Sequence, residues 1–248
     1  MEASATQPTA HEAPDVGSEA LPGSARVAGV PLALVRGVKR GLDVVVSGLM
    51  LAALLPVLCT VAVLVRLDSP GPTFIRCMRV GYRGRPLQML KFRKMVADAT
   101  GAPLTTADDA RFTRLGRWLT KYKFDELPQL WHVLKGEMSL IGPRPESPDF
   151  VERHADDYYG SILTVRPGVI GLSQIAFAEE NRVLDSQDPV GHYLQRILPQ
   201  KVGLDRMYAA RLSLWLDLQI LFWGCVTVLL RRQVAVDRDV ARMTLRRR

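Results

Sequence analysis

Residues 44–65 read VVVSGLMLAALLPVLCTVAVLV, a run of 22 uncharged residues bounded by Asp43 and Arg66. At about 1.5 Å per residue, a straight helix of this length would reach across the ~30 Å hydrocarbon core of a bilayer. A buried core helix is the alternative, but the run is longer and more uniformly apolar than most soluble cores accept. It therefore predicts a helix that enters a membrane.

Two features argue against a simple crossing. Pro56 lies just past the middle of the run, where it removes a backbone donor and kinks the helix. Basic residues flank both ends, and positive-inside bias places both ends on the cytoplasmic side. We expect a re-entrant membrane helix over 31–68 that bends at Pro56 and returns through one leaflet. The flanking residues are Arg36, Lys39, Arg40, Arg66, Arg76 and Arg79.

The composition indicates an anionic partner. The 248 residues include 33 Lys+Arg against 25 Asp+Glu, a formal net charge of +8. Nucleic acid, a phospholipid surface or a phosphorylated substrate would each suit this balance. The three cysteines and four histidines are scattered without disulfide or metal-ligand spacing, which predicts a reducing compartment and no transition-metal site.

The regions beside the apolar run predict two tails and a small β-hairpin. Residues 1–30 lack aromatic residues and any apolar period, so we expect a disordered tail that is not a secretory signal. Residues 233–248 form a basic tail. Turn residues at 70–72 and 81–86 bound short runs that predict the two strands of the hairpin.

Two further segments are amphipathic. Residues 110–122 place an apolar stripe beside basic residues, which suits a helix on anionic headgroups or an ordinary surface helix. Residues 212–230 are apolar but contain Asp217, whose burial cost disfavours a clean crossing. An interfacial helix with Trp215 and Trp223 at headgroup level fits better. The stripe consists of Leu115, Trp118, Leu119 and Tyr122.

The segment KFDELPQLWHVL, residues 123–134, raises a chemical question. It places Asp125 and Glu126 side by side, directly before Leu127-Pro128. Proline favours the first turn of a helix and acids favour its positive end, so Asp125 could simply be a cap. These twelve residues alone leave a cap and a reactive carboxylate equally open.

The motifs taken in order resemble those of the bacterial sugar transferases, the monotopic polyprenyl-phosphate phosphoglycosyl transferases, from about Val38 to Leu230. The long motif over residues 124–145, with KFR upstream and RPG downstream, is highly specific. The chain lacks the long N-terminal extension of larger relatives and resembles the minimal catalytic form. The matching segments are KRGLD (39–43), SPGP (69–72), RVG (79–81), KFRKM (91–95), FDELPQLWHVLKGEMSLIGPRP (124–145), RPGVIGLSQI (166–175) and LDLQIL (216–221).

The resemblance implies a reaction. A nucleotide diphosphate-sugar, expected to be a UDP-sugar, would give its sugar 1-phosphate to polyprenol (undecaprenyl) phosphate and so initiate glycoconjugate or exopolysaccharide synthesis. The position of the family's nucleophile is Asp125, which would hold the phosphosugar covalently. Glu126 would position Mg²⁺ or handle protons, so both acids are expected metal ligands. The expected location is the cytoplasmic face of the bacterial inner membrane.

The resemblance and the residue pattern together predict a mostly helical α+β monotopic membrane protein. We expect a cytoplasmic catalytic domain over 69–205 and a C-terminal interfacial helix over 206–232. The sugar, the nucleotide, the pathway and the oligomeric state stay open, with a homodimer as one option.

Attack on a dianionic phosphate requires an ionised carboxylate and neutralising cations. The clustered prolines and glycines of GPRP and RPG would fix loops that present arginines to a phosphate. For each cation the alternative is a structural ion pair or a solvated surface. The expected phosphate-binding residues are Lys91, Arg93, Lys121, Lys123, Arg144 and Arg166.

Four positions depart from the family pattern. Thr120 stands where the family commonly has Arg, and Lys123 where a small polar residue is preferred, so Lys121 or Lys123 would take over phosphate contacts. The bend carries Leu55-Pro56 in place of Ser-Pro. Residues 179–182, Glu-Glu-Asn-Arg, replace Gly-Arg-Asn and make Arg182 a further candidate.

Two other functions remain to be weighed. A non-enzymatic basic module on a membrane or nucleic acid would explain the charge, but no nucleic-acid motif is present and Asp125-Glu126 would have no purpose. A membrane-bound diphosphate or phosphodiester hydrolase would use the same acids with water as the final acceptor.

Overall fold

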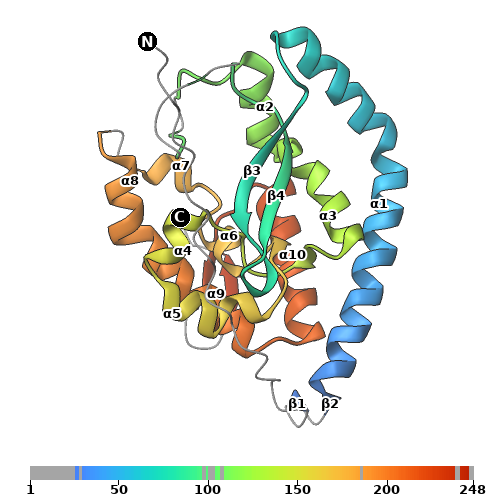
Figure 1. The fold of residues 1–248 in the computed structure, drawn as a ribbon, viewed down its shortest axis with the longest axis vertical. Helices are drawn as coiled ribbons and strands as arrows, with labels where there is room; N and C mark the ends of the chain where they lie inside the picture. Colours follow the sequence, from blue (N-terminus) through green and yellow to red (C-terminus); the bar gives the residue numbers. More distant parts are fainter. Residues whose placement is uncertain are drawn as a thin grey trace, which may run out of the picture.

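The computed structural model describes residues 26–27, 30–96, 99, 104–106, 109–184, 187–237 and 241–245. Most of the expected disordered tail over 1–30 lies outside these residues. Short strands β1 (Arg26–Val27) and β2 (Val30–Pro31) pair just before the long first helix. The described elements are mainly helices with two-stranded sheets, so the predicted mostly helical α+β fold is confirmed (Figure 1).

Helix α1 runs from Leu32 to Asp68, 37 residues, and carries the apolar run. It is long and apolar enough to cross a membrane, and only 11% of its most apolar 18-residue stretch is buried in the protein. The helix remains continuous through Pro56, so the structure describes the expected membrane segment as one helix. Thr60 Oγ1 donates to the Pro56 carbonyl at 2.8 Å, a side-chain bond of the kind that bends helices. Figure 1 shows the C-terminal part of α1 leaning back over the molecule; re-entry into one leaflet stays a prediction.

The two faces of α1 differ in chemistry. Leu34, Val38 and Leu42 lie on an exposed apolar face. The inward face carries the buried Asp43, whose Oδ1 accepts from the Leu140 backbone amide at 3.0 Å. Arg40 caps the end of a neighbouring helix. Polar contacts therefore attach the first turns of α1 to the rest of the protein, and their outer side presents hydrocarbon.

The predicted hairpin is confirmed. Strands β3 (Phe74–Val80) and β4 (Pro86–Phe92) are antiparallel, with Phe74 opposite Phe92 and Val80 opposite Pro86. Their turn, η1 (Tyr82–Gly84), is closed by Arg83 and Gly84 at positive φ. On β4 the side chains of Leu87, Met89 and Lys91 face inward. Period-2 alternation thus carries a lysine into the interior at the far end of the hairpin from its turn.

A helical segment follows the hairpin. Helix α2 (Arg114–Tyr122) is shorter than the expected 110–122 segment, because Thr113 caps it by accepting from Gly116 N at 2.9 Å. It leads into the 3₁₀ turn η2 (Phe124–Gln129) and helix α3 (Leu130–Lys135). Leu119 of the predicted stripe is fully buried, whereas Trp118 and Tyr122 stay exposed. The amphipathic pattern is therefore observed, with its aromatic edge facing outward.

The remaining elements form the body of the protein. A parallel pair of strands, β5 and β6, lies at its centre, with its register set by Ser139 opposite Gly168. Buried residues of α6, α9, α10 and β5 form one core around it. The elements are β5 (Ser139–Ile141), α4 (Pro148–Glu152), α5 (Ala155–Gly160), η3 (Ile162–Thr164), β6 (Gly168–Ile170), α6 (Leu172–Ala176), α7 (Glu180–Val183), α8 (Pro189–His192), the π-helical turn η4 (Tyr193–Ile197), α9 (Leu198–Ala210) and α10 (Leu214–Leu229).

The C-terminal segments pack closely on this body. Helix α9 runs across the expected boundary at 205/206. Asp217 of α10 is paired with Lys39 of α1 at 2.6 Å and accepts from the Tyr208 hydroxyl at 2.7 Å, which explains an acid in an apolar helix. Within the expected basic tail, β7 (Val234–Val236) and β8 (Met243–Leu245) form a hairpin whose inner residues join the core.

Candidate active site

Asp125 lies in the first turn of η2, immediately after a sharp reversal of the chain. Lys123 ends α2 in the left-handed conformation, with φ 61°, and its amide donates to the Leu119 and Thr120 carbonyls. This reversal turns Asp125 inward, where it is only 2% exposed. Its Oδ2 lies 3.5 Å from the Lys94 ammonium, and within the described chain its Oδ1 has no hydrogen-bond partner.

These contacts argue against a capping role for Asp125. A cap accepts a hydrogen bond from a backbone amide in the first turn of its helix. The buried Oδ1 accepts none from the described residues. An unsatisfied buried carboxylate oxygen is costly and requires an explanation, and a reacting or ligand-binding role supplies one.

Glu126 differs sharply from its neighbour because two cations hold it. Its Oε1 accepts from Lys91 Nζ at 2.8 Å and from Arg144 Nη2 at 2.6 Å, and its Oε2 lies 3.3 Å from Arg144 Nη1. Burial alone would raise the pKa of Glu126, but Arg144 and Lys91 outweigh it and hold that pKa well below its usual range. A carboxyl held so firmly in its ionised form is a poor proton donor near neutral pH.

A second buried network lies behind Arg144. Glu146, two residues further on, accepts from the Tyr193 hydroxyl at 2.8 Å and pairs with Lys201 at 3.2 Å. Lys201 also pairs with Glu180 at 3.1 Å. Burial would raise the pKa of Glu146, yet Lys201 and the Tyr193 hydrogen bond lower it below its ordinary value. The segment that carries Arg144 is thus anchored to α7 and α9.

The structure divides the predicted phosphate-binding residues. Lys91 and Arg144 meet at Glu126, as described. The positive charge of Lys123 also lowers the pKa of Glu126, although its side chain is exposed. Lys121 is exposed too, with Nζ 5.5 Å from the centre of the Tyr122 ring.

Arg93 and Arg166 contact backbone carbonyls. Arg93 donates to the carbonyls of Val65, Ser69 and Pro70, so it ties the end of α1 to β4. Arg166 Nε donates to the Gly136 carbonyl at 2.9 Å. A phosphate role for either arginine stays a prediction. The backbone of Arg182 lies in α7, but its side chain is outside the described part of the chain.

Sequence reasoning gives no site role to three polar groups, although it notes Thr120 as a departure from the family pattern. Lys94 is the cation beside Asp125, and its membership of KFRKM was the available signal. Thr120 Oγ1 and both polar atoms of the Gln129 amide are buried without a hydrogen-bond partner in the described residues. Gly116 explains how Lys94 is placed: a Cβ there would lie 1.8 Å from the Lys94 carbonyl oxygen, so only glycine lets α2 press against this backbone.

The residues fit a magnesium ion that takes most of its ligands from a substrate. Mg²⁺ in phosphoryl-transfer sites binds one or two carboxylates together with substrate phosphates and water. Asp125 Oδ1 is an available oxygen, whereas both Glu126 oxygens are engaged by cations. Within the described ranges, no three Asp, Glu, His or Cys side chains converge to form a complete protein cage.

The sequence is similar to those of a known protein family. Residues 34–231 match the family model described as bacterial sugar transferase. The chain belongs to the bacterial sugar transferase family. This agrees with the predicted resemblance over about Val38 to Leu230, and the Asp125–Glu126 site lies within the matched span.

Three relatives illustrate the similarity. An undecaprenyl-phosphate glucose phosphotransferase of Komagataeibacter xylinus is 38% identical over 192 residues, covering 74% of this chain and 34% of that protein. A UDP-N-acetylgalactosamine-undecaprenyl-phosphate N-acetylgalactosaminephosphotransferase of Aeromonas hydrophila is 35% identical over 77% of this chain and 44% of its own. A UDP-glucose:undecaprenyl-phosphate glucose-1-phosphate transferase of Caulobacter vibrioides is 39% identical over 73% and 66%. The chain therefore spans about a third to two-thirds of the length of these relatives.

Proposed function

We propose that this protein transfers a sugar 1-phosphate from a nucleotide diphosphate-sugar, most simply a UDP-sugar, to a polyprenol phosphate such as undecaprenyl phosphate. The observation that carries the proposal is the buried Asp125 carboxylate, whose Oδ1 has no partner among the described residues and whose neighbours are cations. The names of the relatives, which pair UDP-sugars with undecaprenyl phosphate, support the two substrates. The product would initiate polysaccharide synthesis.

In the first step an Asp125 oxygen attacks the β-phosphorus of the nucleotide sugar. A new bond forms between the Asp125 carboxylate oxygen and phosphorus, giving an acyl phosphate (mixed anhydride), as the bond from that phosphorus to the bridging oxygen breaks. The nucleoside monophosphate leaves with the bridging oxygen and the bonding electron pair. A covalent intermediate of this kind divides one difficult transfer into two easier ones.

In the second step an oxygen of polyprenol phosphate attacks the same phosphorus. The bond to Asp125 breaks, the carboxylate is regenerated, and a polyprenyl diphosphate-sugar leaves. A soluble donor and a lipid acceptor then use one site in turn, which predicts ping-pong kinetics.

The cations supply the electrostatic part of the mechanism. The Lys94 ammonium lies 3.5 Å from Asp125 Oδ2, where it can meet the phosphate that Asp125 attacks. Lys91 and Arg144 are held in place by Glu126, so their remaining donors are preorganised for phosphate oxygens. A bound Mg²⁺, held by Asp125 and substrate phosphates, would neutralise charge on the diphosphate.

We further propose that the protein is monotopic on the cytoplasmic face of the bacterial inner membrane. Support comes from the exposed apolar face of α1, the basic residues at both its ends, and the exposed aromatic rings of Trp118 and Trp215. Both ends of α1 would lie on the cytoplasmic side, with Pro56 near its deepest point.

The decisive experiment incubates membranes containing the full chain with a panel of radiolabelled nucleotide sugars, Mg²⁺ and polyprenol phosphate. Label in the organic phase together with release of a nucleoside monophosphate is expected. Water-soluble sugar phosphate would indicate a hydrolase instead. Absence of turnover with every donor would leave a non-enzymatic membrane-binding module.

A further inference from the structure

A small recess, open to solvent, lies between the first turns of α1 and the turn of the β3–β4 hairpin. Arg36, Lys39 and Arg40 line it from α1, and Arg166 lines it from the segment before β6. The transfer mechanism proposed above uses Lys91, Lys94 and Arg144 and gives none of these four side chains a role. Their concentration around one recess requires its own explanation.

The recess carries uncompensated positive charge. Lys39 is paired with Asp217, and the one carboxylate in the lining, Asp43, accepts from the Leu140 amide. Among the described residues, the other three cations form no ion pair. Their observed partners are backbone carbonyls: Thr164 for Arg36 at 3.5 Å, Val133 and Leu134 for Arg40 at 2.6 and 2.9 Å, and Gly136 for Arg166 at 2.9 Å.

Two more features of the lining are typical of a binding site. Ser139 is fully buried, and its hydroxyl has no hydrogen-bond partner in the described residues although it lines the recess. The Arg166 guanidinium stacks over the Tyr82 ring, 5.2 Å from its centre. Stacking fixes the plane of the guanidinium, and in the part of the chain that the structure describes only its Nε has a hydrogen-bond partner. Its terminal donors remain available to a ligand.

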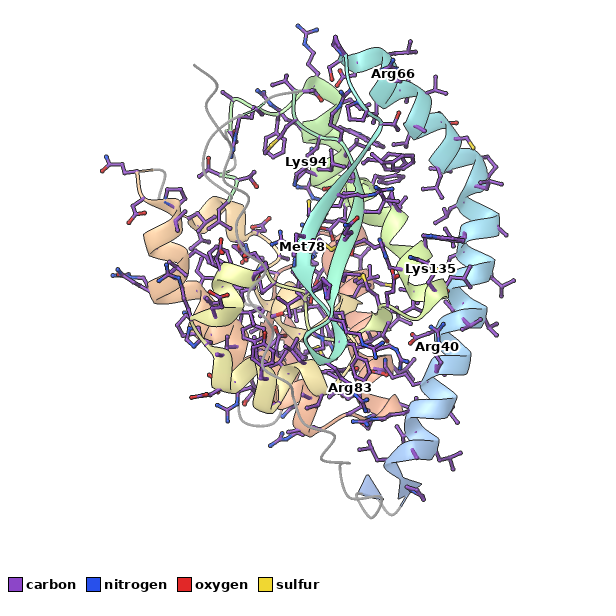
Figure 2. All side chains as sticks on the ribbon, viewed as in Figure 1. Arg40, Arg66, Met78, Arg83, Lys94 and Lys135 are labelled. Atoms are coloured by element: carbon purple, nitrogen blue, oxygen red, sulfur yellow. The ribbon has the colours of Figure 1, made fainter. Side chains whose placement is uncertain are left out.

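The recess is separate from the Asp125 site. Tyr82 lies in the hairpin turn, whereas Lys91 lies near the other end of β4. Five residues of strand from Pro86 to Lys91 cover roughly 16 Å at about 3.3 Å per residue. Figure 2 shows the same separation, with Lys94 and Arg83 at opposite ends of the hairpin.

We propose that this recess binds the phosphoryl group of a phosphate ester or of free phosphate, independently of the transfer reaction. Guanidinium groups match phosphate geometry with paired donors, and a hydroxyl adds a further donor. The site needs several such donors around one anion, and Arg36, Arg166 and Ser139 provide them. Lys39 and Arg40, which also line the recess, add positive charge.

The surroundings point to a membrane lipid as one source of this group. The turns of α1 that carry the cations on their inner side carry Leu34, Val38 and Leu42 on their exposed side. A lipid whose chains cover this apolar face would bring its headgroup phosphate to the edge of the recess. Free phosphate is the other source with the same chemistry.

The test measures thermal stability of the full chain in maltoside micelles during ligand titration. The probes are dihexanoyl phosphatidylglycerol, dihexanoylglycerol without phosphate, and inorganic phosphate with chloride at matched ionic strength. Among the described residues, the Arg36 guanidinium makes one long hydrogen bond, 3.5 Å to the Thr164 carbonyl, so its removal should disturb the fold little. Arg36→Gln should raise the half-saturating concentration of the phosphate-bearing probe about tenfold, the effect of losing one charge-assisted donor. Arg83→Gln, an exposed residue of the same hairpin turn outside the recess, is the matched control.

Saturable, Arg36-dependent stabilisation by phosphatidylglycerol alone supports the site with a lipid headgroup as its ligand. The same response to inorganic phosphate supports it with a free anion. Equal responses of Arg36→Gln and Arg83→Gln, or responses that dihexanoylglycerol and chloride reproduce, would overturn the proposal. Arg36→Lys, which keeps the charge but loses the fork, should fall between wild type and Arg36→Gln and covers the case in which the glutamine variant does not fold.

Discussion

The two ends of the β3–β4 hairpin treat their charges differently. At the Lys91 end, Glu126 is bound by Lys91 and Arg144, and Lys94 lies beside Asp125, so cations and carboxylates nearly balance. At the Tyr82 end, Arg36, Arg40 and Arg166 contact carbonyls and remain unbalanced. On the proposals made above, the first arrangement suits a buried carboxylate that reacts with phosphate, and the second suits the binding of an anion. The partner of each basic side chain, a carboxylate or a backbone carbonyl, therefore indicates whether its positive charge is already neutralised.

The largest expected effect follows removal of the unpartnered carboxylate. Asp125→Asn deletes the anionic oxygen with almost no change in volume, so turnover should fall to background while membrane association persists. With labelled donor and no acceptor, peptide mass spectrometry of the wild type should place a sugar phosphate on Asp125. Glu126→Gln, the matched neighbour, should be severely impaired but still accumulate some adduct. An adduct elsewhere, or ordered ternary-complex kinetics, would contradict the mechanism.

The next largest effect concerns the cations at that end. Lys91→Ala and Arg144→Ala should each lower kcat by about 10²-fold, the typical loss when one charged donor is removed from a reacting phosphate. Arg83→Ala, at the other end of the hairpin, should retain activity. Near wild-type turnover in a folded Arg144→Ala protein would assign Arg144 a purely structural role.

A smaller effect is expected in the pH dependence of stability. Burial raises the pKa of Asp205 to about 7, and this residue is near the network behind Arg144. The folded state keeps a proton that the unfolded chain, with a carboxyl pKa near 4, has lost by neutral pH. This contribution to stability is fully present below about pH 4 and is lost as pH rises to about 7.

Asp205→Asn should therefore raise Tm by several degrees at pH 8 and change it little at pH 4. Thermal unfolding across this range is the measurement. Asp149→Asn, at a residue of α4 outside this network, provides the control. An unchanged pH profile in Asp205→Asn would show that Asp205 is ionised in the folded protein.

The smallest effect is expected from a substitution in the middle of α1. Pro56→Ala restores a backbone donor and removes a ring clash, so it should shift α1 toward a straight, spanning form. Single cysteines at Arg36 and Ser69, added to a background without the three native cysteines, should label from the same side of sealed vesicles. Labelling from opposite sides in the parent protein would rule out re-entry.

Local patterns predicted the local parts of this molecule well. Alternating apolar residues and turn residues located the hairpin, and helical periodicity located α2. The motif pair of Asp125 and Glu126 identified the candidate site, whose catalytic role stays a prediction. Lys91 and Arg144 were expected there from the chemistry of phosphate, and they do meet at Glu126.

The partners of the other cations could not be predicted. Arg93 caps α1 and Arg166 binds Gly136 because of where distant segments pack, and no periodicity encodes that. The pairing of Lys201 with Glu146 joins residues 55 positions apart. Pro56 likewise signals a kink, but neighbouring turns kept α1 helical through it.

The left-handed joint at Lys123 has a mechanical consequence. It connects α2, with the exposed rings of Trp118 and Tyr122, to η2, and Trp118 packs against Phe124 with ring centres 5.1 Å apart. If α2 lies in the headgroup layer as proposed, the turn at Lys123 sets how far Asp125 lies below the membrane surface. On the function proposed above, the protein would then select an acceptor by the height of its phosphate in the headgroup layer and would not discriminate by the length of its hydrocarbon chain.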